Sequence, residues 1–176
     1  KELKANFGLH KVLEYYISSQ TNGIVHERFD IAYIALECLC SSVRKYAEDN
    51  GEILTISDIQ ETEDMLRSLL KDLNEQISEK SLKIISKELS YKHISIKDEQ
   101  YFTFDRFGIK YDKKTVKELY EVRNALFHGG DFDFMKLFER TVQLFDLLDR
   151  TILMMLGWKG KAYISKSRGY TLTILE

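Results

Sequence analysis

The chain has 176 residues, 44% of them hydrophobic and 12% aromatic, so it is long enough to bury one substantial core. Its 26 Lys and Arg residues nearly balance its 28 Asp and Glu residues, and the net charge of -2 gives no overall argument for binding nucleic acid or an anionic membrane. Proline is absent and the apolar residues recur mostly at intervals of three and four, which predicts a mainly helical protein.

Two helices are predicted in the amino-terminal part of the chain. The first extends from about Ala5 to Ser19 and ends at the polar stretch SQTNG. The second begins near His26 and continues to EDNG. Over the run IAYIALECLC it is apolar nearly all round, which is typical of a central, buried helix. This run contains Glu37 and is too short to cross a bilayer, so no membrane span is predicted.

The middle of the chain has a weaker pattern. Ser57 and Gln60 form a capping-box pair that predicts the start of a third helix, and a shorter helix is expected from about Glu79 to Leu89. Between Ser90 and Tyr111 the helical period is lost. We expect this aromatic-rich stretch to be an ordered loop, with or without a short strand.

Capping residues mark the next helix at both ends. It begins either at the capping-box pair Thr115 and Glu118 or slightly earlier, with Asp112 as the cap. Gly129 and Gly130 suit a left-handed carboxyl-terminal stop.

A last long helix is predicted from about Phe132 to Leu156, with a stop at Gly157. After it, KAYISKSRGYTLTIL alternates well enough for a small hairpin that turns near Arg168 and Gly169. The expected fold class is therefore all-α: a bundle of five or six helices with a small carboxyl-terminal β-hairpin.

The two cysteines and the amino end bear on the setting of the chain. Cys38 and Cys40 point about 200° apart on a helix, so they cannot bridge one another, and without further cysteines they make no zinc site. Free, buried thiols favour a reducing, cytoplasmic setting. KELKANFGLH has neither an apolar signal core nor an initiating Met, so we expect residues 1–176 to be one domain at the carboxyl-terminal end of a longer protein, after an upstream domain.

An arginine interrupts the apolar face of the helix that contains ELYEVRNALFHGG. On a wheel of about 100° per residue, Arg123 falls close to the centre of an apolar arc. A buried guanidinium must find a carboxylate, a subunit interface or an anionic ligand, because leaving it unpaired is very costly. Glu37, on the central helix, is the obvious carboxylate. The arc consists of Val116, Leu119, Tyr120, Val122, Leu126 and Phe127.

His128 stands in the last turn of the same helix, where the helix dipole favours the imidazolium form. Histidine can act as an acid or a base near neutral pH, but a carboxyl-terminal histidine can also simply complement the dipole. Arg123 and His128 diverge by about 140° on an ideal helix, so the two do not meet at one phosphate automatically. Either the long arginine side chain wraps round, or a partner subunit contributes a second copy of the helix.

Other candidate residues have weaker patterns. Lys159, Lys161 and Arg168 alternate with aromatic residues in the carboxyl-terminal stretch, a mixture that can hold phosphates and stack bases, although solvated lysines beside core aromatics look the same in a sequence. His10, His26 and His93 have no ligand-like spacing and are interpreted as surface or packing residues. No glycine-rich phosphate loop, catalytic triad, cofactor motif or metal site is indicated.

The stretch RNALFHGG resembles the Arg, polar residue and His motif of the HEPN superfamily (higher eukaryotes and prokaryotes nucleotide-binding domains). With the long helix after it, the following LLGWKGKAYI and the earlier RFDIAYIALECL, it looks most like the Apea-like branch. The resemblance covers roughly residues 29 to 164.

The resemblance implies an all-helical homodimer whose motif helices face one another, and in active members metal-independent RNA cleavage. Arg123 would neutralise the scissile phosphate and His128 would transfer a proton. Asn124 would orient one of these two side chains. Glu37 and Tyr120 would be supporting residues. The leading hypothesis is an endoribonuclease module of an antiviral defence or toxin-like protein. The alternative is a non-catalytic dimerisation or nucleotide- or RNA-binding module of a larger signalling protein.

Overall fold

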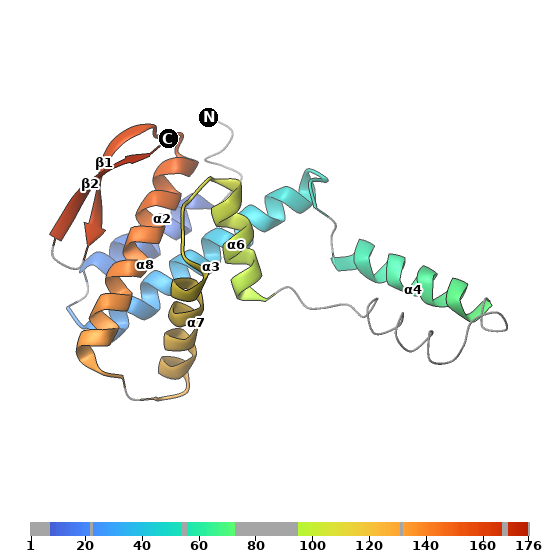
Figure 1. Cartoon of the computed structure of the whole chain (residues 1–176), viewed down its shortest axis with the longest axis horizontal. Coiled ribbons are helices and arrows are strands. Elements are labelled where there is room, and N and C mark those ends of the chain that lie inside the picture. Colours follow the sequence, from blue (N-terminus) through green and yellow to red (C-terminus); the bar gives the residue numbers. More distant parts are fainter. Residues whose placement is uncertain are drawn as a thin grey trace. The chain divides into compact units, whose positions relative to one another are not determined.

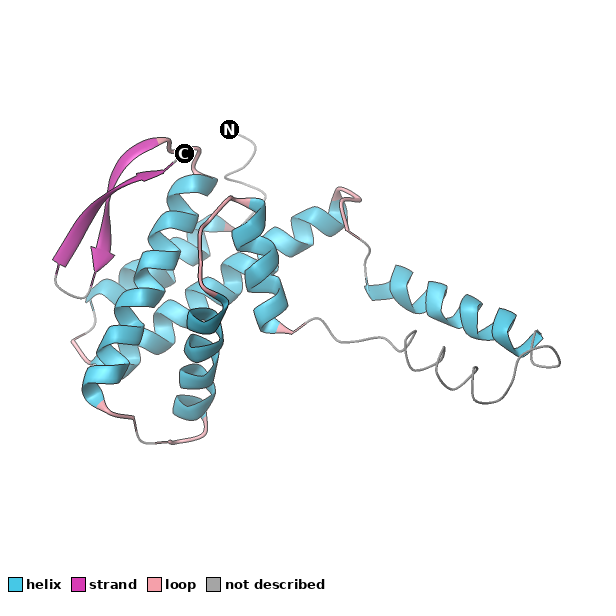
Figure 2. Ribbon diagram, in the orientation of Figure 1, coloured by secondary structure: helices cyan, strands magenta, loops and turns pink. Residues whose placement is uncertain are grey.

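The computed structural model describes residues 8–21, 23–53, 56–72, 95–130, 132–166 and 169–175. The chain divides into two compact units, one formed by Lys1–Tyr46 with Ser95–Glu176 and the other by Ala47–Ile94. Figure 1 labels the elements, and Figure 2 shows that helices dominate the described residues. The elements are α2 (Leu9–Thr21), α3 (Val25–Asp49), α4 (Ile56–Asp72), α6 (Ile96–Arg106), α7 (Lys113–Phe127), α8 (Phe134–Met155), β1 (Gly160–Lys166) and β2 (Gly169–Leu175).

The central helix of the first unit is α3, as predicted. Phe29, Tyr33, Leu36 and Leu39 are all buried on one face of it, within about 120° of one another around the helix axis, and α2, α6, α7 and α8 supply further residues of the same core. Cys40 is buried in the same helix as a free thiol. The prediction of a mainly helical fold is confirmed for the residues that the structure describes.

The ends of α7 follow from local capping. Asp112 is the amino-terminal cap, and its carboxylate accepts hydrogen bonds from the backbone N–H groups of Lys114 and Thr115. At the other end Gly129 adopts a left-handed φ of 71°, and the N–H of Gly130 donates to the carbonyl of Ala125 at 2.8 Å. This carboxyl-terminal stop sets the backbone position of His128, the residue before Gly129.

The prediction for residues 90–111 was wrong in part, because α6 occupies Ile96–Arg106. Ser95 and Asp98 form a reciprocal capping box that starts the helix. Its buried face carries Gln100 and Thr103 beside Phe104, and these polar residues hid the apolar period in the sequence.

Other boundaries also differ from the expectations. Helix α2 continues to Thr21, two residues beyond the predicted end. Helix α4 begins at Ile56, so Ser57 lies inside its first turn and is not the cap. Asp133 caps α8, which therefore begins at Phe134. The helix expected at 79–89 lies outside the described residues.

In the first unit β1 and β2 pair as antiparallel strands, from Gly160 opposite Leu175 to Lys166 opposite Gly169. Of the two predicted turning residues, Arg168 lies outside the described residues and Gly169 is the first residue of β2. Strand β1 packs along α8, as Figure 1 shows. Among the described residues, none of the helices combines the length and apolar character that crossing a membrane requires.

Candidate functional site

Helices α3, α6 and α7 meet along a line of polar side chains, which we call the polar seam. Its members are Tyr33, Glu37 and Arg44 of α3, Glu99 and Gln100 of α6, and Arg123 of α7. Contacts cross the seam at three levels. Arg44 pairs with Glu99 at 2.9 Å, the amide of Gln100 donates to the Tyr33 hydroxyl at 2.9 Å, and Arg123 pairs with Glu37 at 3.2 Å.

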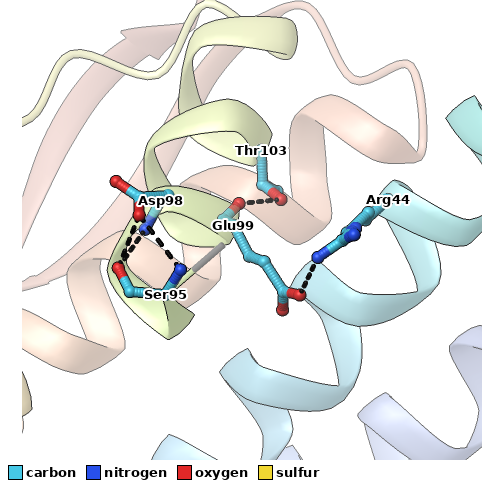
Figure 3. A network of polar contacts seen from close by, with 5 residues as sticks. All are labelled: Arg44, Ser95, Asp98, Glu99 and Thr103. Carbon is cyan, nitrogen blue, oxygen red and sulfur yellow. Dashed lines mark hydrogen bonds and ion pairs between the residues drawn. The ribbon is translucent and has the colours of Figure 1, made fainter. Parts of the chain in front are cut away.

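The α3–α6 part of the seam is structural. Figure 3 shows Arg44 reaching across to Glu99, the residue directly after Asp98 of the Ser95 and Asp98 capping box. Gln100 and Tyr33 are almost fully buried, and burial raises the pKa of the Tyr33 hydroxyl, so it stays protonated. These contacts pair polar groups of α3 with polar groups of α6.

Arg123 occupies the α3–α7 part of the seam, where the sequence predicted a buried cation. Its Nε and Glu37 Oε1 form an ion pair that lacks hydrogen-bond geometry. Another guanidinium nitrogen donates to Asn124 Oδ1 at 3.2 Å, and the guanidinium carbon lies 4.4 Å from the centre of the Phe127 ring. The Arg123 side chain is still 24% exposed. Arg123 is therefore paired with Glu37 but remains partly accessible to solvent.

The positive charge of Arg123 acts on two carboxylates of α3, those of Glu37 and Asp30. Burial raises the pKa of Glu37, and the positive charge of Arg123 opposes that rise. Burial also raises the pKa of Asp30, two turns earlier, and His26 and then Arg123 oppose it. Oδ1 of Asp30 is buried and has no hydrogen-bond partner among the described residues.

His128 is the carboxyl-terminal cap of α7, and its backbone N–H donates to the carbonyl of Asn124 at 3.1 Å. Its side chain is exposed. The helix is regular as far as Phe127, so the divergence of about 140° between Arg123 and His128 expected from the wheel still applies. The structure therefore joins Arg123 to Glu37 and Asn124, and it leaves His128 at the open end of the same helix.

The remaining predicted site residues, which are Tyr120 and three basic residues of the carboxyl-terminal stretch, are not members of the polar seam. Tyr120 is half-buried on α7, and Lys97 Nζ lies 5.0 Å from the centre of its ring. Lys159 is exposed after the carboxyl end of α8, and about 33 Å of helix separates it from the α7–α8 connection. Lys161 lies in β1, but its side chain and Arg168 are outside the described residues.

Sequence reasoning missed Asp30 as a neighbour of Arg123 and set His26 aside. The signal was present in the spacing. Residues four and seven apart share a helix face, so His26, Asp30 and Glu37 form one line on α3. Asp30 went unnoticed because it precedes the apolar run in which Glu37 stood out.

A separate hollow of about 340 Å³ lies at the other end of α7. Its lining includes Lys110, Asp112, Asp146 and Arg150. The Arg150 guanidinium is already bound to Asp146 at 2.6 Å and to the Lys110 carbonyl. None of the residues around Arg123 lines this hollow.

No group of three or more His, Cys, Asp or Glu side chains suited to holding a metal ion occurs in the part of the chain that the structure describes. Comparisons of the chain with protein-family models, with curated proteins and with solved structures found no match. The HEPN resemblance therefore rests on the motif residues alone and stays a prediction.

Proposed function

We propose that this chain is a HEPN-type, metal-independent endoribonuclease module of a defence or toxin-like protein, most like the Apea-like branch. The observation that carries the proposal is Arg123: a partly exposed guanidinium, fixed by Glu37 at 3.2 Å, on a helix whose end presents the exposed His128. A fixed cation and a group that titrates near neutrality are what RNA cleavage without a metal requires.

Each residue has a defined role in this proposal. Arg123 binds the scissile phosphate and stabilises the charge that develops on it. Asn124 accepts a hydrogen bond from Arg123 at 3.2 Å and so holds the guanidinium in place. His128 transfers a proton at the ribose 2′-hydroxyl or at the leaving oxygen.

Arg123 and His128 of one helix diverge by about 140°. In a homodimer this divergence would not separate the two groups, because the partner's motif helix would bring a second His128 towards Arg123. Exposed apolar side chains support such an interface. Phe127, Phe134 and Met135 flank the α7–α8 connection and are each more than half exposed. Phe127 lies within the motif at the end of α7, and Phe134 and Met135 begin α8.

The second candidate function is a non-catalytic dimerisation or nucleotide-binding module, activated through an upstream domain. One observation favours it: Glu37 already neutralises Arg123, so a phosphate must compete with an internal carboxylate. An arginine used only to hold α7 against α3 would be paired in the same way.

Incubation of the purified chain with mixed RNA in EDTA tests the proposal. We expect cleavage, and we expect Arg123→Ala and His128→Ala each to lower the rate by about a hundredfold or more. His10→Ala is the matched control, because His10 is an exposed histidine on α2. Wild-type protein that leaves the RNA intact, or cleavage that is unchanged by both motif substitutions, would favour the non-catalytic module.

A further inference from the structure

Two lysines lie over tyrosine rings where α6 meets α7. Lys97 Nζ of α6 lies 5.0 Å from the centre of the Tyr120 ring of α7. In the reverse direction, Lys113 Nζ of α7 lies 5.5 Å from the centre of the Tyr101 ring of α6, and that ring is itself stacked on Tyr111. Because a ring face attracts an ammonium group, these contacts restrain two side chains that are otherwise flexible.

Both lysines lie on the side of α7 that carries Arg123. Residues three and seven apart share a helix face, so Lys113, Tyr120 and Arg123 fall within about 80° of one another around α7. The helix rises about 15 Å from Lys113 to Arg123. Lys97 reaches the level of Tyr120, between these two cations. We call Lys97, Lys113 and Arg123 the cation row.

The lysines of the cation row can be reached by a ligand. Lys113 is exposed and Lys97 is half-buried. Within the described part of the chain, neither lysine forms an ion pair, whereas Lys117 of the same helix pairs with Glu121 at 3.7 Å. The two ammonium groups are therefore held by rings and not neutralised by carboxylates.

The acidic residues next to these lysines in the sequence belong to helix caps. The carboxylate of Asp98 accepts hydrogen bonds from the backbone N–H and the hydroxyl of Ser95. The carboxylate of Asp112 accepts hydrogen bonds from the backbone N–H groups of Lys114 and Thr115. Both carboxylates thus offset the partial positive charge of a helix amino terminus, which leaves the lysines for an external anion.

We propose that the cation row is the track on which an RNA strand lies, with Lys97 and Lys113 binding phosphates that neighbour the scissile phosphate at Arg123. The inference rests on the proposed function, which supplies RNA as the ligand, and it extends the site from α7 to α6. Tyr120 and Tyr101 are positioning residues, since they act through the lysines. Phosphates repeat along a strand whatever its bases, so the row binds RNA without reading its sequence.

The test measures affinity for a fluorescein-labelled 2′-O-methyl RNA strand of about ten nucleotides. Its attacking hydroxyl is blocked, so fluorescence anisotropy reports binding apart from cleavage. We expect Lys97→Gln and Lys113→Gln each to weaken binding by about fivefold at about 0.1 M salt, because one phosphate contact on a single strand contributes about 0.7 to the slope of log affinity against log salt. That slope should become shallower by the same amount. Lys11→Gln, at an exposed lysine of α2, is the matched control and should change neither quantity.

Two further kinds of variant separate charge and positioning from folding. Lys97→Arg and Lys113→Arg keep the positive charge and should retain the wild-type salt slope. Tyr120→Leu keeps an apolar side chain but removes the ring face under Lys97. We expect it to weaken binding by about two- to fivefold with an unchanged salt slope, because the lysine is less well placed but still reaches its phosphate.

The outcomes distinguish the inference from the function on which it rests. Glutamine variants that bind the strand as tightly as wild type overturn the inference alone, as do arginine variants that bind as weakly as the glutamine variants. Equal weakening by Lys11→Gln, or a wild-type chain that does not bind the strand, also overturns it. A wild-type chain that binds the strand through the cation row but leaves cleavable RNA intact supports the inference and overturns the endoribonuclease function.

Discussion

The Nε atom of Arg123 lies 3.2 Å from Oε1 of Glu37, across the contact between α7 and α3. The two side chains are 24% and 26% exposed, so the pair is neither a solvated surface bridge nor a sealed one. The same contact that holds α7 in place also keeps the candidate phosphate-binding group occupied. Stability and ligand access at this site are therefore linked.

The ion pair should matter to stability mainly when one partner is removed. We expect Glu37→Leu or Arg123→Met alone to lower the free energy of unfolding by about 1–3 kcal/mol, because each leaves a half-buried charge without its partner. The double substitution should recover much of that loss. Urea unfolding of the four proteins measures the coupling.

Lys117 and Glu121 provide the control on the same helix. Their ion pair, at 3.7 Å, involves side chains that are 64% and 58% exposed. Its removal should change the free energy of unfolding by no more than about 0.5 kcal/mol. Equal coupling energies for the two pairs would contradict the view that burial distinguishes Arg123.

The stability contribution of Asp30 should depend on pH with a sign set by its raised pKa. The folded state binds the Asp30 proton more tightly than the unfolded state, whose carboxyl has the ordinary pKa of 3.8, so wild-type protein loses stability as pH rises from 3.8 through the raised value. Asp30→Asn removes this loss. We expect the variant to gain stability relative to wild type as pH rises from 3.8 through the raised value, measured by urea unfolding at each pH.

Asp112→Asn should behave in the opposite sense. Hydrogen bonds from the backbone of Lys114 and from the side chain and backbone of Thr115 hold the pKa of Asp112 below 3.8, so its contribution is present above 3.8 and is lost as pH falls through the lowered value. Relative to wild type, the variant should therefore lose stability as pH rises through that window. If the stability difference between variant and wild type changes with pH in the same direction for Asp30→Asn and for Asp112→Asn, the raised pKa assigned to Asp30 is wrong.

The amino end of α6 should be sensitive to its capping residue. Ser95 Oγ accepts a hydrogen bond from the backbone N–H of Asp98, whose carboxylate accepts one from the backbone N–H of Ser95 at 3.0 Å. We expect Ser95→Ala to cost about 1 kcal/mol in the free energy of unfolding. Ser41→Ala, at an exposed position within α3, is the control and should be neutral or slightly stabilising.

The same capping box shows what the sequence could predict and what it could not. Helices α3, α7 and α8 were predictable because apolar residues recur on the face that each one buries. In α6 the buried face includes Gln100, whose amide is satisfied by Tyr33 on α3, and no pattern local to residues 95–106 shows a partner 67 positions away. The Ser95 and Asp98 pair was the available local signal.

The site was predictable to a similar extent. The place of Arg123 in an apolar arc required a partner, and the structure provides Glu37, one of the alternatives that the sequence left open. The contribution of Asp30 depends on how α3 crosses α7, which the periodicity of either helix alone does not determine. The separation of His128 from Arg123, in contrast, followed directly from their spacing.

A last prediction concerns the exposed apolar residues at the α7–α8 connection. If Phe127, Phe134 and Met135 form the proposed dimer interface, Phe134→Glu should weaken self-association by at least about tenfold, because it places a charge in an apolar contact. Sedimentation over a range of protein concentrations measures the effect. Trp158→Glu is the matched control, since Trp158 is 50% exposed near the opposite end of α8. A monomeric wild-type chain, or equal weakening by both substitutions, would contradict an interface at the connection, and active monomers would require all catalytic groups to come from one protomer.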